Sequence, residues 1–170
     1  MDLDYWPDLR DNHGLEGMVC RDAESRELIV YIDEWLADHR PTRYRMTVAE
    51  EAGHGVLHRS VIDQINNPED FRELQQHALW RDMDRNSKRF AAALLMPGAV
   101  VTEHAGRIYT RLVRVAGFGD LDAVKRHLAS QLAKQFEVSA ESMTYRLGEW
   151  PMKVFERVEE AMRDRLDYLE

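Results

Sequence analysis

The chain has 170 residues, and its 31 acidic residues against 23 Lys and Arg give a net charge of −8. This balance argues against a broad nucleic-acid surface, because DNA affinity rests on basic side chains that neutralise phosphates. Cys20 is the single cysteine, which excludes an internal disulfide. Because no apolar run is long enough to span a bilayer and no secretion signal is present, we expect a cytoplasmic protein of one domain over residues 1–170.

The N-terminal third predicts a small sheet followed by helices. Residues 1–16 have no clear period and predict a poorly ordered or docking arm. Residues 17–20 and 27–33 are dense in apolar and β-branched side chains, so they predict two short strands joined by a turn. Residues 34–39 predict a short helix that ends before Pro41, and the main helix is expected from about residue 42 to residue 60.

The middle of the chain predicts a turn and a second long helix. Residues 61–80 are polar and contain Asn66-Asn67-Pro68, a strong turn signal. A helix is expected over residues 71–95, and its apolar segment over residues 90–95 is expected to lie in the core rather than in a site.

The C-terminal part is expected to contain further helices. Residues 117–120 predict a turn, and residues 121–147 predict two amphipathic helices that separate near Val138-Ser139. Residues 153–169 predict a highly charged C-terminal helix. The fold class is therefore α+β, mostly helical with a small N-terminal sheet.

The main helix carries the residues that could bind a metal or take part in catalysis. Glu50, His54 and His58 recur every four residues and share one face, with Glu51 beside them. This order, Glu-Glu-x-x-His, is one residue away from the His-Glu-x-x-His motif of zinc hydrolases. The opposite side of the helix is apolar and is expected to be buried, namely Val48, Ala49, Ala52, Val56 and Leu57.

Three segments together resemble the ImmA/IrrE family of zinc metallopeptidases. The helix over residues 44–58 is similar to the family's zinc-binding helix, and residues 90–97 read Phe-Ala-Ala-Ala-Leu-Leu-Met-Pro as in the family. Residues 132–139 followed by Arg146-Leu147 match a third family pattern. The resemblance covers about residues 15–150 and implies a zincin-like metallopeptidase domain, with residues 151–170 as an added C-terminal helix.

The resemblance implies a role for each motif position. Zn²⁺ would be held by Glu50, His54 and Asp84, and Glu51 would be the general base. Glu50 stands where the family has its first His, and Asp84 stands where it has Glu. Two further departures precede Phe90, where Ser87 and Lys88 replace the family's Ala-Asn or Ala-Asp.

The implied activity is zinc-dependent cleavage of a regulatory protein. The expected substrate is a helix-turn-helix repressor of a prophage, a mobile element or a stress regulon. The alternative is a catalytically degenerate relative that binds such a regulator without cutting it. A direct nucleic-acid role is disfavoured, since the helix-turn-helix-like segment over residues 131–147 offers only Arg146 on its second helix.

Other readings of the same residues stay open. Glu50 could close a capping box on Thr47 instead of binding metal. His58 could bind a metal with His54 at i, i+4 spacing, although we prefer a supporting role beside the ligands. His77 could be a replacement ligand, although a surface position is favoured, and Asp82 is the alternative to Asp84.

Overall fold

The computed structural model describes residues 1–22, 24–114 and 119–167. Contacts divide the chain into two compact units, Met1–Leu95 and Met96–Glu170. The predicted α+β class, mostly helical with a small N-terminal sheet, is confirmed. The expectation of a single domain over residues 1–170 stays a prediction.

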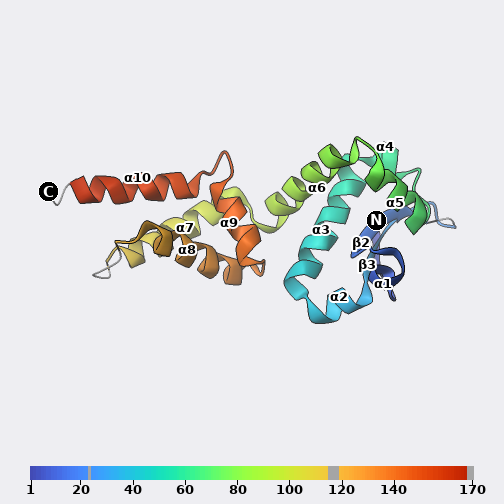
Figure 1. The fold of residues 1–170 in the computed structure, drawn as a ribbon, viewed down its shortest axis with the longest axis horizontal. Coiled ribbons are helices and arrows are strands. Elements are labelled where there is room, and N and C mark those ends of the chain that lie inside the picture. Colours follow the sequence, from blue (N-terminus) through green and yellow to red (C-terminus); the bar gives the residue numbers. More distant parts are fainter. Residues whose placement is uncertain (23, 115–118, 168–170) are drawn as a thin grey trace. The chain divides into compact units, whose positions relative to one another are not determined.

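The sheet of the first unit has the order β1-β3-β2 (Figure 1). The strands β2 (Gly17–Arg21) and β3 (Leu28–Asp33) pair antiparallel, which confirms the predicted strand pair. The strand β1 (Asp2–Trp6) runs parallel to β3, with Leu3 opposite Val30. Residues 1–16 were predicted to be a poorly ordered or docking arm, and the poorly ordered alternative was wrong. Most β1 side chains are exposed, so this edge strand shows no apolar alternation and is held by backbone pairing.

Six helices are described in the rest of this unit: α1 (Leu9–His13), α2 (Glu34–His39), α3 (Pro41–Leu57), α4 (Arg59–Ile62), α5 (Pro68–Gln76) and α6 (Trp80–Leu95). The Asp33 carboxylate caps α2 by accepting from the Leu36 N–H at 3.2 Å. Pro41 separates α2 from α3 and lies in the first turn of α3, where its missing N–H costs nothing.

The predicted continuous helix over residues 71–95 was wrong, because the chain breaks between α5 and α6. Asn67 caps α5 by accepting from the Asp70 N–H at 2.9 Å, and Pro68 occupies its first turn. The turn signal at Asn67-Pro68 is therefore the start of a helix.

Helix α3 lies between the sheet and α6, with contacts on both sides (Figure 1). Apart from Met46, its buried residues are small or polar, and they include Glu51, Gly53 and His54. The predicted burial of Val56 and Leu57 was wrong, since both are exposed near the end of the helix. The segment 90–95 is likewise only partly a core segment: Ala91 is fully buried, whereas Leu94 is 57% exposed.

The hydrophobic core of the first unit lies around the sheet and joins β2 and β3 to the flanking helices. Its buried members are Leu9, Leu15, Met18, Val19, Cys20, Leu28, Val30, Ile32, Leu36, Ile62, Ile65 and Phe71. On the sheet side of α3, Thr47 and Glu51 lie against Gly17 of β2.

The second unit consists, over its described residues, of α7 (Gly98–Leu112), α8 (Leu121–Phe136), α9 (Ala140–Gly148) and α10 (Val154–Asp167). The two helices predicted over residues 121–147 are confirmed, and Ser139 caps the second by accepting from the Ser142 N–H. Residues 117 and 118 of the predicted turn, and the end of the predicted C-terminal helix at 168–169, lie outside the described residues. None of the described helices is both long and apolar enough to cross a membrane.

Candidate functional site

The candidate site forms where α3 and α6 pack against each other. Gly53 permits their close approach: a Cβ atom there would lie 3.2 Å from both Cα and the carbonyl oxygen of Ser87 and 3.1 Å from the Phe90 ring. Contacts that tight require the neighbour to move, so any larger residue would push the helices apart. The glycine before His54 therefore sets the distance between His54 and α6.

His54 is buried and bonded on both sides of its ring. Its Nε2 lies 2.9 Å from the Ser87 hydroxyl oxygen, and its Nδ1 lies 3.2 Å from Nδ1 of His58. The ring of Trp80 stacks on its face, with centroids 4.8 Å apart and planes 7° apart. Burial, and next the neighbouring His58, lower the pKa of His54 to about 4, so the ring is neutral at pH 7 and carries one N–H.

The hydrogen-bond directions around His54 follow from one hydroxyl. Ser87 Oγ–H donates to the Asp84 carbonyl oxygen at 2.9 Å, and a hydroxyl has only one hydrogen to give. Ser87 Oγ must then accept from Nε2–H of His54. The remaining ring nitrogen of His54 accepts from Nδ1–H of His58. Neither nitrogen of His54 is left with a free lone pair for a metal.

Asp84 is also engaged. Its Oδ2 lies 2.7 Å from Nζ of Lys88, one helical turn further along α6. The Lys88 ammonium is therefore paired with the carboxylate that the family resemblance assigns to the metal. Burial raises the pKa of Glu50, and the charges of Arg43 and then Lys88 oppose that rise.

Glu50 and Glu51 are neighbouring carboxyls, and few basic side chains offset their charges. Burial first, and then the charge of Glu50, raise the pKa of Glu51 to about 8, against smaller opposing effects of the Val19 backbone and Arg43. Burial also raises the pKa of Glu50. Among the described residues, neither glutamate has a salt-bridge partner.

Two buried polar atoms face this region without a partner. Glu51 is 8% exposed and Thr47, one turn earlier on α3, is 3% exposed. Within the described part of the chain, Glu51 Oε2 and Thr47 Oγ1 have no hydrogen-bond partner. An unsatisfied buried acceptor costs about 1–3 kcal/mol, so this pair of atoms calls for a ligand.

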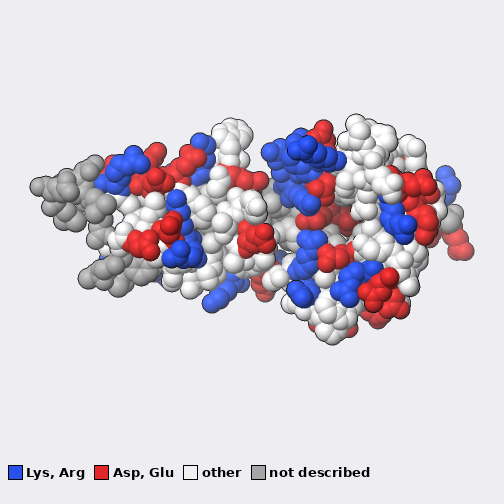
Figure 2. Space-filling view, in the orientation of Figure 1, with Lys and Arg blue, Asp and Glu red and all other residues white. Residues whose placement is uncertain are grey.

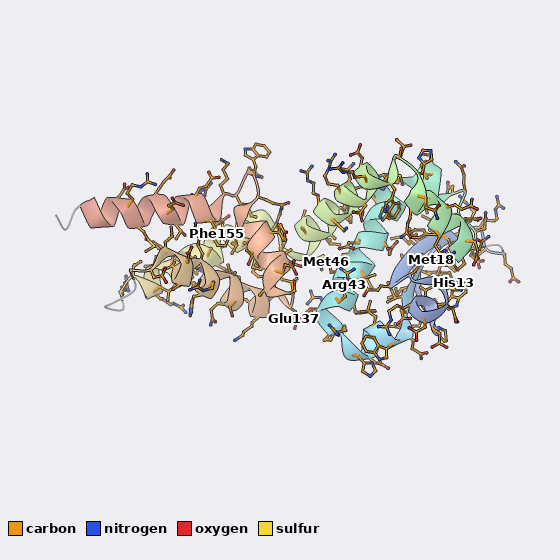
Figure 3. All side chains as sticks on the ribbon, in the orientation of Figure 1. His13, Met18, Arg43, Met46, Glu137 and Phe155 are labelled. Carbon is orange, nitrogen blue, oxygen red and sulfur yellow. The ribbon has the colours of Figure 1, made fainter. Side chains whose placement is uncertain are left out.

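These side chains open into one cleft of about 400 Å³. Arg43, labelled in Figure 3 on α3, belongs to its wall and donates from Nε to Glu16 Oε2 at 2.6 Å. The lining residues that bear charge or can hydrogen-bond through their side chains are Arg10, Glu16, Arg43, Thr47, Glu50, Glu51, His54, Gln75, Trp80, Asp84 and Lys88.

Four of the predicted site residues, Glu50, Glu51, His54 and Asp84, thus line the same cleft. His58 supports His54 from the side. His77 is exposed at the end of α5, where its Nδ1 accepts from the Leu79 N–H, and it does not line the cleft.

Sequence reasoning missed Trp80 and Arg43 as parts of the site. Trp80 precedes Asp84 by four residues, so helical spacing alone places both on one face of α6. Arg43 lies seven residues before Glu50, two turns along α3.

The donor types suit zinc better than their arrangement does. Two carboxylates and an imidazole are acceptable zinc ligands. Among the described residues, however, no three His, Cys, Asp or Glu side chains are grouped so that they could hold a metal ion. His54 has no free lone pair, and Asp84 is held by Lys88. The residues as arranged do not fit the ion, and the ligand and base assignments stay predictions.

Comparison with known proteins adds one finding. Residues 21–148 match the family model of the IrrE N-terminal-like domain, a peptidase M78 model. The matched segment begins at the end of β2 and ends with α9, so α10 lies outside it. No curated protein and no solved structure matches the chain.

Proposed function

Because the chain belongs to the ImmA/IrrE family of zinc metallopeptidases, we propose that its cleft binds a segment of another protein and does not hydrolyse it. The partner we propose is a helix-turn-helix transcriptional regulator, as the family resemblance implies. The chain would act on that regulator by holding it, and the regulator would stay full-length.

The observation that carries this proposal is that His54 and Asp84 are both bound to other side chains. The imidazole donates to Ser87 and accepts from His58, and the Asp84 carboxylate is paired with Lys88. Hydrolysis of a peptide bond needs an activated water and a group that stabilises the developing oxyanion. The cleft retains polar walls, an aromatic ring and several hydrogen-bonding groups, which suit the binding of a peptide segment.

One observation favours zinc-dependent endopeptidase activity as a second candidate. Glu51 is buried, its Oε2 has no partner among the described residues, and its pKa is raised to about 8. A carboxyl group with a pKa near the working pH is suited to general base catalysis. Zn²⁺ would be held by Glu50, His54 and Asp84, and this would require Ser87 and Lys88 to give up their contacts.

The test is to mix the purified full chain with the helix-turn-helix regulators encoded beside its gene, with added ZnCl₂ or with EDTA. Gel filtration reports the complex, and intact mass spectrometry reports cleavage. We expect co-elution with an uncut regulator in both conditions. Zinc-dependent cleavage that is lost in Glu51→Ala would overturn the proposal in favour of the endopeptidase, and the absence of any complex would overturn it as well.

A further inference from the structure

Some charged side chains of the cleft form ion pairs, and others do not. Arg43 is bonded to Glu16 at 2.6 Å, and Lys88 is bonded to Asp84 at 2.7 Å. The third lining cation, Arg10, donates from Nε to Asp11 at 3.3 Å and lies over the Trp35 ring at 4.4 Å. Glu50 and Glu51 are therefore the two cleft carboxyls that the described cations leave without an ion pair.

The surface around the cleft does not alter this balance. Figure 2 shows Lys and Arg side chains gathered over α6, which carries Arg81, Arg85, Lys88 and Arg89. Of these four, Lys88 is the one that lines the cleft. The other three basic residues of α6 do not line the cleft, and the α3 residues that line it include Arg43 as well as Glu50 and Glu51.

Two hydrogen-bonding atoms without a partner indicate what kind of ligand could bind beside the unpaired carboxyls. Glu51 Oε2 and the Thr47 hydroxyl can each accept a hydrogen bond, they lie one turn apart on α3, and both residues line the cleft. A ligand can satisfy both atoms by donating to them, and a positive charge on that ligand would favour the ionised forms of Glu50 and Glu51, whose pKa values burial raises. An arginine guanidinium meets both requirements and binds a carboxylate through two parallel N–H groups, while a lysine ammonium meets them as a point charge.

We infer that the cleft seats a basic side chain of the bound protein, with its cationic group against Glu50 and Glu51 and within hydrogen-bonding reach of Thr47. The inference rests on the proposed function, since it names what the protein-binding cleft selects. Trp80 also lines the cleft, with one face of its ring stacked on His54. Selection then depends on charge as well as shape.

The experiment compares two peptides with the full chain by calorimetry. One is acetyl-Ala-Leu-Arg-Leu-Ala-amide, and the other carries citrulline, which keeps the shape of arginine and removes its charge. We expect the arginine peptide to bind at least about tenfold more tightly, and EDTA to leave this ratio unchanged. Equal affinity of the two peptides, undetectable binding of both, or loss of the preference in EDTA would overturn the inference.

Variants locate the preference in the cleft. Glu51→Gln should reduce the ratio to near one, and Glu50→Gln, at a less buried position, serves if the first variant does not fold. The matched control is Glu73→Gln, an exposed α5 position that changes the net charge equally and should keep the full ratio. An unchanged ratio in both cleft variants would also contradict the inference.

This outcome is separable from that of the proposed function. A regulator that co-elutes intact, together with equal binding of the two peptides, would remove the inference alone. A regulator that is cut, together with a clear arginine preference, would remove the proposed function and leave the inference standing as substrate selection.

Discussion

The hydroxyl oxygen of Ser87 on α6 lies 2.9 Å from Nε2 of His54 on α3. This contact joins the two helices through buried polar atoms, because Ser87 is 1% exposed and His54 is 2% exposed. It also directs the proton of His54 towards α6, which leaves Nδ1 to His58. The bond therefore has a structural consequence and a chemical one, and each can be measured.

Ser87→Ala should lower the free energy of unfolding by roughly 1–3 kcal/mol, because it leaves Nε2–H of His54 buried without an acceptor. Urea denaturation measures the change. The control is Ser60→Ala at an exposed position, which should stay within about 0.5 kcal/mol of the wild type. Equal stability of the two variants would show that the Ser87–His54 bond contributes nothing.

Gly53→Ala should destabilise the protein by about 1–3 kcal/mol, since the new methyl group would press on the Ser87 backbone at 3.2 Å. Gly106→Ala is the matched helical control, because a Cβ there meets nothing within 4 Å. That variant should be neutral or more stable by up to about 1 kcal/mol, since alanine is the better helix former. Thermal unfolding of both variants checks the opposite signs, and a stable Gly53→Ala would contradict the close packing of α3 on α6.

The stability of the wild type should fall relative to Glu51→Gln as pH rises from about 5 to 8. The pKa of Glu51 is raised from 4.5 to about 8 in the folded chain, so the unfolded chain loses this proton first. Between these two pKa values the folded chain keeps a proton that the unfolded chain has released. This lowers the free energy of unfolding by up to about 1.4 kcal/mol per pH unit.

The matched comparison isolates Glu51. His54 has the opposite sign, since its lowered pKa removes stability as pH falls from 6.5 towards 4, but it is present in both proteins. Urea denaturation at pH 5, 6, 7 and 8 gives the two profiles. Parallel profiles would show that Glu51 ionises normally in the folded state.

The wild type should hold well under one zinc per chain after dialysis against ZnCl₂, because His54 and Asp84 are engaged by Ser87 and Lys88. The double variant Glu50→His, Lys88→Asn should hold close to one, since it restores an imidazole and removes the competing ammonium. Elemental analysis measures both. His54→Ala in the variant background should lose the ion again.

The opposite result has a clear meaning. Near-stoichiometric zinc in the wild type, lost in both His54→Ala and Asp84→Ala, would show that the ion displaces Ser87 and Lys88. The second candidate function, the zinc endopeptidase, would then take first place.

The sequence by itself determined the features that depend on local spacing. Helical periodicity placed Glu50, His54 and His58 on one face of α3. The β2–β3 pair and the two helices after residue 120 followed from apolar patterning and turn residues. These features need no knowledge of which elements pack together.

The tertiary structure alone decided which partners the polar atoms find. Ser87 meets His54 only because Gly53 lets α6 approach α3, and Trp80 covers the imidazole from the same helix. The edge strand β1 is held by backbone pairing, and the pattern of its side chains does not indicate a strand. The reason is physical: periodicity fixes the face of a helix, whereas a hydrogen bond near 3 Å depends on the contact between two elements distant in sequence. In this protein that contact gives His54 a partner other than a metal.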